Sequence, residues 1–184
     1  MMLDEAFRNY RQKIVKKWVD YTLSTYEASS FFKKEKDQFS NPVGGNTRES
    51  LDRLFVLLTG EADSKEFVKP LGLVMNIRSI QEFTASQAVA PLHAVKHITR
   101  TVFEKDKETR GLIAELYEFE FRVDLMVLAA FDLYMQNRER LYQVRIAEIR
   151  SGNHLLTDSK CPSALLKEKK GSPVLRSVTP IDGS

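Results

Sequence analysis

Polar side chains that could bind a ligand gather in one largely apolar stretch, IRSIQEFTASQAVAPLHAVKH, which covers residues 77–97. The stretch supplies a guanidinium, two carboxamides, a carboxylate and a hydroxyl, at Arg78, Gln81, Gln87, Glu82 and Ser86. Such groups in a partly apolar pocket could hold a small molecule by hydrogen bonds. They could equally satisfy the backbone groups that stay unpaired wherever a helix ends. The sequence leaves both interpretations open.

Two histidines of the same stretch could bind a metal or haem. His93 and His97 are four residues apart, so they would share one face of a helix, as two zinc ligands do. However, HAVKH lacks the glutamate of the H-E-x-x-H motif, and no third ligand is near in the sequence. A histidine, or the thiolate of Cys161, could also ligate haem. We expect no cofactor, and keep a haem- or metal-dependent sensor as an alternative.

Motifs of enzymatic catalysis are missing from the sequence. The chain has neither the G-x-S-x-G motif nor a glycine-rich phosphate loop. No glutamate stands three residues before a histidine, which excludes the di-iron carboxylate bundles. Cys161 lies in a loop-like tail, where a free thiol is usually inert. We therefore expect that the protein is not an enzyme and has no catalytic residues.

Composition and charge are those of a globular protein in water. Of the 184 residues, 42% are hydrophobic and 29% are charged, and the net charge is +3. No basic face is clustered enough to predict nucleic-acid binding. The longest apolar run, VDLMVLAAFDLYM, is interrupted by two aspartates and is shorter than the roughly 20 residues of a membrane span. With one cysteine and a charged N-terminus, we expect a cytoplasmic protein without membrane insertion.

Apolar residues recur at helical spacing through most of the chain, which predicts an all-α bundle of five or six helices. Phe31, Phe32 and Phe39 are expected to pin a loop between the first two helices. Asn46 or Thr47 is expected to cap the second helix. The expected helices cover residues 3–26, about 46–59 with Gly60 as the end, 64–82, and about 85–103 with Thr84 or Ser86 as the cap.

Residues 106–150 contain no proline and only one glycine, so they are predicted to be helical. The segment ELYEFEFRVDL alternates like a strand, but it has helical flanks and no second strand to pair with. A single helix over 45 residues would exceed the size of the domain. We expect either a break near residues 133–140 or a helix that projects from the body. Residues 1–150 would form the helical domain, and 151–184 a mostly irregular tail.

Motifs in a fixed order carry a family resemblance. A helix with a tryptophan, KKWVDYTLSTY, is followed by F-x-N-P-V-G at residues 39–44 and by I-R-x-I-Q-[DE]-F-x-x-S-Q-A at residues 77–88. Over about residues 5–145 the chain resembles the N-terminal domain of the RsbRD-type RsbT co-antagonists. The resemblance adds Asn41 to the candidate ligand-binding residues.

The resemblance implies a sensory input domain of bacterial stress regulation, with no catalytic residues. Related domains resemble globins without haem and tend to dimerise, so a globin-like bundle and a homodimer are expected. The STAS domain that usually follows has no room after residue 150. We therefore expect a stand-alone copy whose output is another protein.

These observations give one leading hypothesis and two alternatives. The leading hypothesis is a non-enzymatic signalling or sensor domain that binds a small ligand or a regulatory protein partner. The first alternative is the haem- or metal-dependent sensor. The second is a purely structural dimeric adaptor, because apolar residues on two faces of 112–134 could place the long final helix at a dimer seam.

Overall fold

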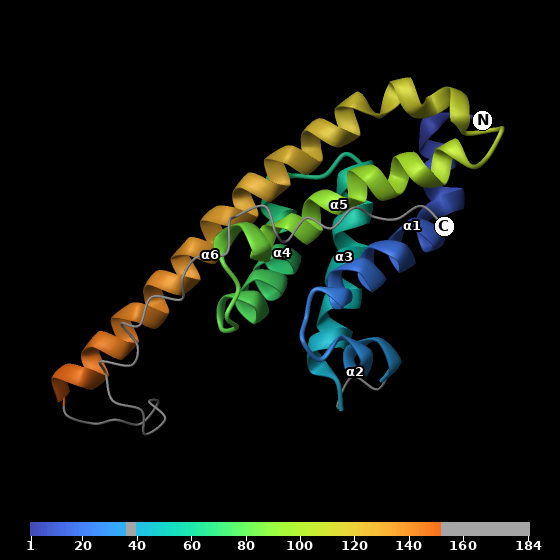
Figure 1. Cartoon of the computed structure of the whole chain (residues 1–184). Helices are drawn as coiled ribbons and strands as arrows, with labels where there is room; N and C mark the ends of the chain where they lie inside the picture. Colours follow the sequence, from blue (N-terminus) through green and yellow to red (C-terminus); the bar gives the residue numbers. More distant parts are fainter. Residues whose placement is uncertain (36–39, 152–184) are drawn as a thin grey trace.

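The computed structural model describes residues 1–35 and 40–151, which form an all-α bundle (Figure 1). Within these residues there are six α-helices, one 3-10 helix and no strand, so the predicted fold class is confirmed. The elements are α1 (Leu3–Ser24), α2 (Ser29–Lys34), α3 (Pro42–Thr59), α4 (Ser64–Ser79), α5 (Ala85–Glu104), η1 (Arg110–Leu116) and α6 (Tyr117–Ser151).

Large apolar side chains from five helices, α1, α3, α4, α5 and α6, form the core. α1 packs against α3 and α5, while α6 lies along α4 and α5. Phe7 of α1 contacts the rings of Phe55 and Phe119, from α3 and α6, with centroids 6.0 and 5.1 Å away. Trp18 is fully buried, and its indole N–H donates to the carbonyl of Pro91 at 2.8 Å. The amphipathic spacing of α1 is therefore explained by burial on two neighbours.

The prediction of a loop between the first two helices is wrong. It contains α2, and α3 begins at Pro42 rather than near residue 46. Asn41, and not Asn46 or Thr47, caps α3 by accepting a hydrogen bond from the backbone N–H of Gly44 at 2.8 Å. Proline suits the first helical position because the N–H it lacks would be unpaired there. Pro42 therefore starts a helix instead of interrupting one.

The aromatic residues expected to hold this segment against the core differ in their burial and contacts. Phe32 packs edge-on against Tyr26 at a centroid distance of 5.4 Å and contacts the core. Phe31 is about half exposed and contacts Phe32. Phe39 lies outside the described residues. Of the described residues, Phe32 is therefore the one that holds this segment against the core.

The observed ends of the next helices are close to the ends predicted from the sequence. α4 begins at the predicted residue and ends at Ser79, three residues before the predicted end. Thr84 caps α5 in a capping box with Gln87, each side chain bonding the backbone N–H of the other residue. Of the two caps considered for α5, Thr84 is the one used. Helices α3 and α5 end at the expected positions, within one residue.

The break expected near residues 133–140 is absent, because α6 continues unbroken for 35 residues. The other expectation, a projecting helix, is confirmed: the orange end of α6 extends beyond the rest of the bundle in Figure 1. At 1.5 Å per residue its length is about 52 Å. The alternating segment ELYEFEF forms the end of η1 and the start of α6. The predicted tail, from residue 152 on, lies outside the described residues.

None of the helices in the described ranges is long and apolar enough to cross a membrane.

Gly44 and Gly72 provide a matched pair of glycine variants. A Cβ at Gly44 would lie 2.3 Å from the Asn41 amide nitrogen, whereas a Cβ at Gly72 would meet nothing within 4 Å. Gly44→Ala should therefore lower the free energy of unfolding by about 1–2 kcal/mol through loss of the cap. Gly72→Ala should raise it by about 0.5–1 kcal/mol, since alanine favours helix interiors. Urea unfolding measures both, and equal effects would refute the cap geometry.

Candidate functional site

Most of the predicted ligand-binding residues lie at the junction between α4 and α5. Ser86 and Gln87 belong to the first turn of α5, where the Ser86 hydroxyl is 3.2 Å from that of the capping residue Thr84. Gln81 and Glu82 lie in the turn between the two helices. Gln81 is half-buried and Glu82 is exposed. The structure thus brings together five of the six predicted residues, and Arg78 is the only fully buried one among them.

Arg78 bonds a carbonyl that a proline leaves free. In a regular helix the carbonyl of Gln87 would accept from the N–H of residue 91, but Pro91 has no N–H. The guanidinium of Arg78 donates to this carbonyl instead, at 2.9 Å from Nη2. Its Nη1 donates to the hydroxyl of Thr25, at the end of α1, at 3.1 Å. One side chain of α4 therefore joins the end of α1 to the first turns of α5.

Two aromatic rings enclose the same guanidinium. The centre of the guanidinium lies 4.1 Å from the ring of Phe83 and 4.9 Å from that of Tyr26. A cation over an aromatic face is stabilised by the ring quadrupole, and the effect grows when water is excluded. Burial lowers the pKa of Arg78 from its ordinary value. Burial thus disfavours the charged form, and the two rings and the hydrogen bonds of the guanidinium offset part of this cost.

Donors from α6 satisfy other carbonyls of the junction. The hydroxyl of Tyr134 donates to the carbonyl of Phe83, and Arg138 donates to that of Ser79 at 3.2 Å. Burial raises the pKa of Tyr134, which keeps its hydroxyl protonated as a donor. Carbonyls at a helix end need such partners because the helix itself supplies none. This geometry supports the interpretation of residues 77–87 as a helix junction, while a ligand role for Gln81 and Glu82 stays a prediction.

Asn41, the sixth predicted residue, is buried at the start of α3. Its carboxamide nitrogen donates to the carbonyls of Phe32 and Glu35 at 3.0 and 2.8 Å. Its oxygen accepts from Gly44, so both ends of the carboxamide are used. Phe32 in turn contacts Tyr26, which stacks on Arg78. The two sequence motifs that contain Asn41 and Arg78 are thus linked through one aromatic cluster.

The two histidines lie on α5 and face different partners. His93 contacts Asp124 of α6, with Nε2 3.1 Å from the carboxylate. His97 lies 3.4 Å from the hydroxyl of Thr101 on its own helix. Within residues 1–35 and 40–151 no three His, Cys, Asp or Glu side chains gather where they could hold a metal ion. Cys161, the thiolate considered for haem, lies outside these residues.

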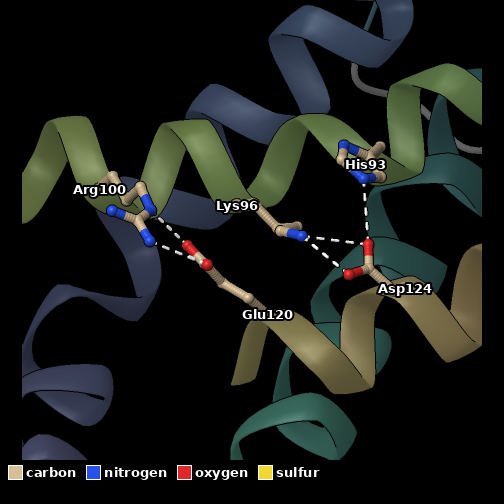
Figure 2. A network of polar contacts seen from close by, with 5 residues as sticks. All are labelled: His93, Lys96, Arg100, Glu120 and Asp124. Atoms are coloured by element: carbon tan, nitrogen blue, oxygen red, sulfur yellow. Dashed lines mark hydrogen bonds and ion pairs between the residues drawn. The ribbon is translucent and has the colours of Figure 1, made fainter. Parts of the chain in front are cut away.

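Ion pairs join α5 to α6 along one side (Figure 2). Lys96 lies 3.0 Å from Asp124, and Arg100 donates to Glu120. Burial would raise the pKa of Asp124, but hydrogen bonds and charge from Lys96 and His93 outweigh burial and lower it. The network is partly exposed to water, and ion pairs in such positions add only modest stability.

An exposed apolar stripe runs along α6, apart from the polar motifs. The stripe consists of residues that recur every seven positions and are 47% to 64% exposed: Phe121, Leu128, Met135, Tyr142 and Ile149. The buried residues of α6 lie on the opposite face, at Phe119, Val123, Met126, Ala130 and Tyr134. The sequence signal was present, since apolar residues on both faces of 112–134 suggested a second contact surface.

A groove adjoins the N-terminal part of this stripe. Its volume is about 390 Å³, and it lies between α6 on one side and the end of α3 and first half of α4 on the other. Apolar side chains line most of it, including Phe67 and Leu71 of α4 and Phe121 and Leu125 of α6. Arg122 stands at the groove, where it donates to the carbonyl of Gly60 and pairs with Glu118 at 3.5 Å. The stripe and the groove are neighbours, since Phe121 belongs to both.

Comparison with known proteins identifies the family. The model of the RsbT co-antagonist protein rsbRD N-terminal domain matches residues 12–149, three quarters of the chain. The chain belongs to this family. RsbRD N-terminal domains are regulatory domains of bacterial stress signalling, so that broad function is established for this chain. No curated protein and no solved structure matches the chain significantly, and the globin-like arrangement therefore stays a prediction.

Arg78 and Pro91 should be energetically coupled in this RsbRD N-terminal domain. Arg78→Met should lower the free energy of unfolding by about 3 kcal/mol, because it leaves buried hydrogen-bonding groups unpaired. In a Pro91→Ala background the same change should cost about 1 kcal/mol less, since the new N–H can bond the Gln87 carbonyl. A double-mutant cycle by urea unfolding measures the coupling. Strict additivity would contradict the proposed role of the carbonyl.

Asp124 should contribute to acid sensitivity. Its pKa is lowered in the folded state, so its stabilisation is present above the ordinary value of 3.8 and is lost as the pH falls through the lowered folded-state pKa. Asp124→Asn should therefore reduce the amount by which the free energy of unfolding falls as the pH is lowered into the acid range. Asp106, whose pKa a hydrogen bond from Tyr10 lowers, remains in this variant and should leave a residual slope. An unchanged acid limb would show that the α5–α6 network does not persist in solution.

Proposed function

We propose that this domain is a non-enzymatic regulator that acts by binding another protein through the exposed face of α6. The observation that carries the proposal is the apolar stripe with its groove. Apolar side chains that are exposed along one face of a helix over several turns usually mark an interaction site. The stripe follows a helix of 35 residues, which suits a protein partner better than a small molecule.

The polar junction supports a non-catalytic role. Arg78, Asn41 and Gln87 direct their donors and acceptors at backbone groups of the same chain. General acid–base catalysis needs a group that can reach a substrate and exchange a proton with it. The buried guanidinium of Arg78 instead bonds the Gln87 carbonyl in the first turn of α5 from α4. We therefore assign this junction to the fold and the exposed face of α6 to the output, with no cofactor required, in a cytoplasmic signalling protein.

A small ligand is the second candidate, and the groove is the observation that favours it. A volume of about 390 Å³ falls within the range of known small-molecule sites, and its lining is mostly apolar. Native mass spectrometry of the purified protein, compared with its denatured mass, tests this candidate. Additional mass on the native protein would support a bound ligand. Equal native and denatured masses would remove this candidate for the purified state.

Leu128→Asp should abolish regulation without unfolding the domain. Leu128 is 64% exposed, so a charge there costs little in the free domain but is expensive inside a protein interface. We expect loss of stress-responsive transcription of a reporter gene in the host bacterium, with the protein level and circular dichroism unchanged. Transcription at the level of the original protein would refute the role of α6.

Ile80→Asp is the matched control for this experiment. Ile80 is 69% exposed and apolar, but it lies at the end of α4. If only Leu128→Asp acts, the output surface is on α6. If only Ile80→Asp acts, the surface is the α4–α5 junction, and the proposal is wrong.

A further inference from the structure

We propose that residues 155–166 of the same chain bind along the exposed face of α6, as an extended segment that runs back from the end of this helix. The first leucine pair of this segment, residues 155–156, would pack between Tyr142 and Ile146. The second pair, residues 165–166, would fill the groove. The inference rests on the proposed function of the exposed face as a binding surface, and it names the regulation of that surface by the chain itself.

The end of α6 places the start of the segment beside the stripe. Ile149 is the last residue of the stripe, and the helix ends at Ser151. Gly152 and Asn153 follow in the sequence, and both residue types favour turns because they readily adopt the backbone conformations that reverse a chain. A chain that turns back at this point meets the C-terminal end of the stripe first.

The two leucine pairs are spaced like the two apolar areas that they would cover. The pairs are ten residues apart in the sequence, which is about 33 Å in an extended chain at about 3.3 Å per residue. Tyr142 follows Phe121 by 21 residues on α6, which is about 32 Å at about 1.5 Å per residue. Ile146 follows Leu125 by the same distance, and all four of these side chains are exposed. One extended segment can therefore place both pairs on apolar surface at once.

An extended conformation is the one that fits, because a helical segment would be too short. As a helix, the ten residues that separate the pairs would span only about 15 Å. Pro162 lies between the pairs, and a proline inside a helix removes a backbone hydrogen bond. The way back from Ser151 to Leu125 measures about 39 Å along α6. Residues 152–165 reach about 46 Å when extended, which leaves length for the turn.

Charges on the segment and on α6 are opposite at matching levels. In the register set by the leucines, Lys160 lies near Asp132, and Lys167 lies near Glu118 at the groove. Asp132 and Glu118 are both exposed, so that a lysine can approach either carboxylate. Complementary charges at matching positions favour one direction and one register of binding. The basic residues that follow the second leucine pair would thus lie at the acidic first turn of α6.

A segment bound in this way would keep other proteins from the stripe. Because the segment is covalently attached, its effective concentration at the stripe is in the millimolar range, and a modest contact is enough to hold it there. A protein partner must displace the segment, so its apparent affinity falls in proportion to the time during which the stripe is free. The segment would therefore act as an inhibitor of the output surface within the same chain.

Cys161 provides a probe of this arrangement, since it lies between the two leucine pairs. It follows the first pair by about 18 Å in an extended chain, which is the level of the exposed Asp132 on α6. Asp132→Cys should therefore form an intramolecular disulfide on mild oxidation, although the change removes one of the two charge pairs. We expect a rate about 10-fold or more above that of Phe31→Cys, a control with an exposed cysteine on α2.

Charged substitutions of the second leucine pair test its role as the anchor. Leu165→Asp/Leu166→Asp in the Asp132→Cys protein should lower the rate to that of the Phe31→Cys control. Val174→Asp/Leu175→Asp adds the same charge farther along the chain and should leave the rate unchanged. Electrophoresis without reductant measures the disulfide within one chain, and circular dichroism checks that each variant is folded.

Three results of this experiment would overturn the proposal. The first is an Asp132→Cys rate no higher than that of the control. The second is an equal loss of rate in both pairs of aspartate substitutions, which would show that added charge and not the leucine anchor matters. The third is a disulfide between two chains whose rate rises with protein concentration, which would place the segment on a second copy.

The failure of this inference and that of the proposed function are distinguishable. If the rapid disulfide is absent and Leu128→Asp still abolishes regulation, a protein partner binds an uncovered stripe and only this inference is wrong. If the rapid disulfide forms and Leu128→Asp leaves regulation unchanged, the segment covers the stripe but the proposed function of the stripe is wrong.

Discussion

The guanidinium of Arg78 joins three helices at a point where the backbone lacks a partner. Pro91 removes an N–H from the second turn of α5, which leaves the carbonyl of Gln87 unpaired inside the protein. A buried carbonyl without a partner is costly, so the proline is tolerable only if another donor reaches it. Arg78 supplies that donor from α4 and reaches α1 through Thr25. This single side chain thus bonds to groups at α1 and α5 from α4, in addition to the apolar contacts that these helices share.

The rest of the junction follows from the same constraint. A buried cation needs a surrounding that compensates for lost water, and the rings of Tyr26 and Phe83 provide it. Phe32 packs on Tyr26, and Asn41 holds the carbonyl of Phe32. Both segments that identify the family, around Asn41 and around Arg78, therefore serve one packed end of the bundle. This arrangement explains why such polar residues occur among apolar ones without requiring a ligand.

With the junction assigned to the fold, the exposed face of α6 is the proposed interaction surface. One face of α6 completes the core, while the other carries the apolar stripe and borders the groove. A regulatory domain needs a surface that responds to a partner and a body that holds that surface in place. The division between the α4–α5 junction and the exposed face of α6 meets both needs. It also separates residues that maintain the fold from the residues of the proposed output surface.

The sequence by itself determined the helical class, the ends of most helices and the family, because spacing and capping residues act locally. The sequence pattern placed the start of α3 too late, because Pro42 and Gly44 are typical of a loop. In the structure Pro42 is the first residue of the helix, and Asn41 caps it by accepting from the N–H of Gly44. The sequence also left the role of residues 77–87 open. Only the tertiary structure decided that Arg78 points at a carbonyl freed by Pro91, thirteen residues away in the chain. It alone showed that one apolar face of α6 is buried while the other remains exposed, because burial depends on which helices come together and not on the pattern of one helix.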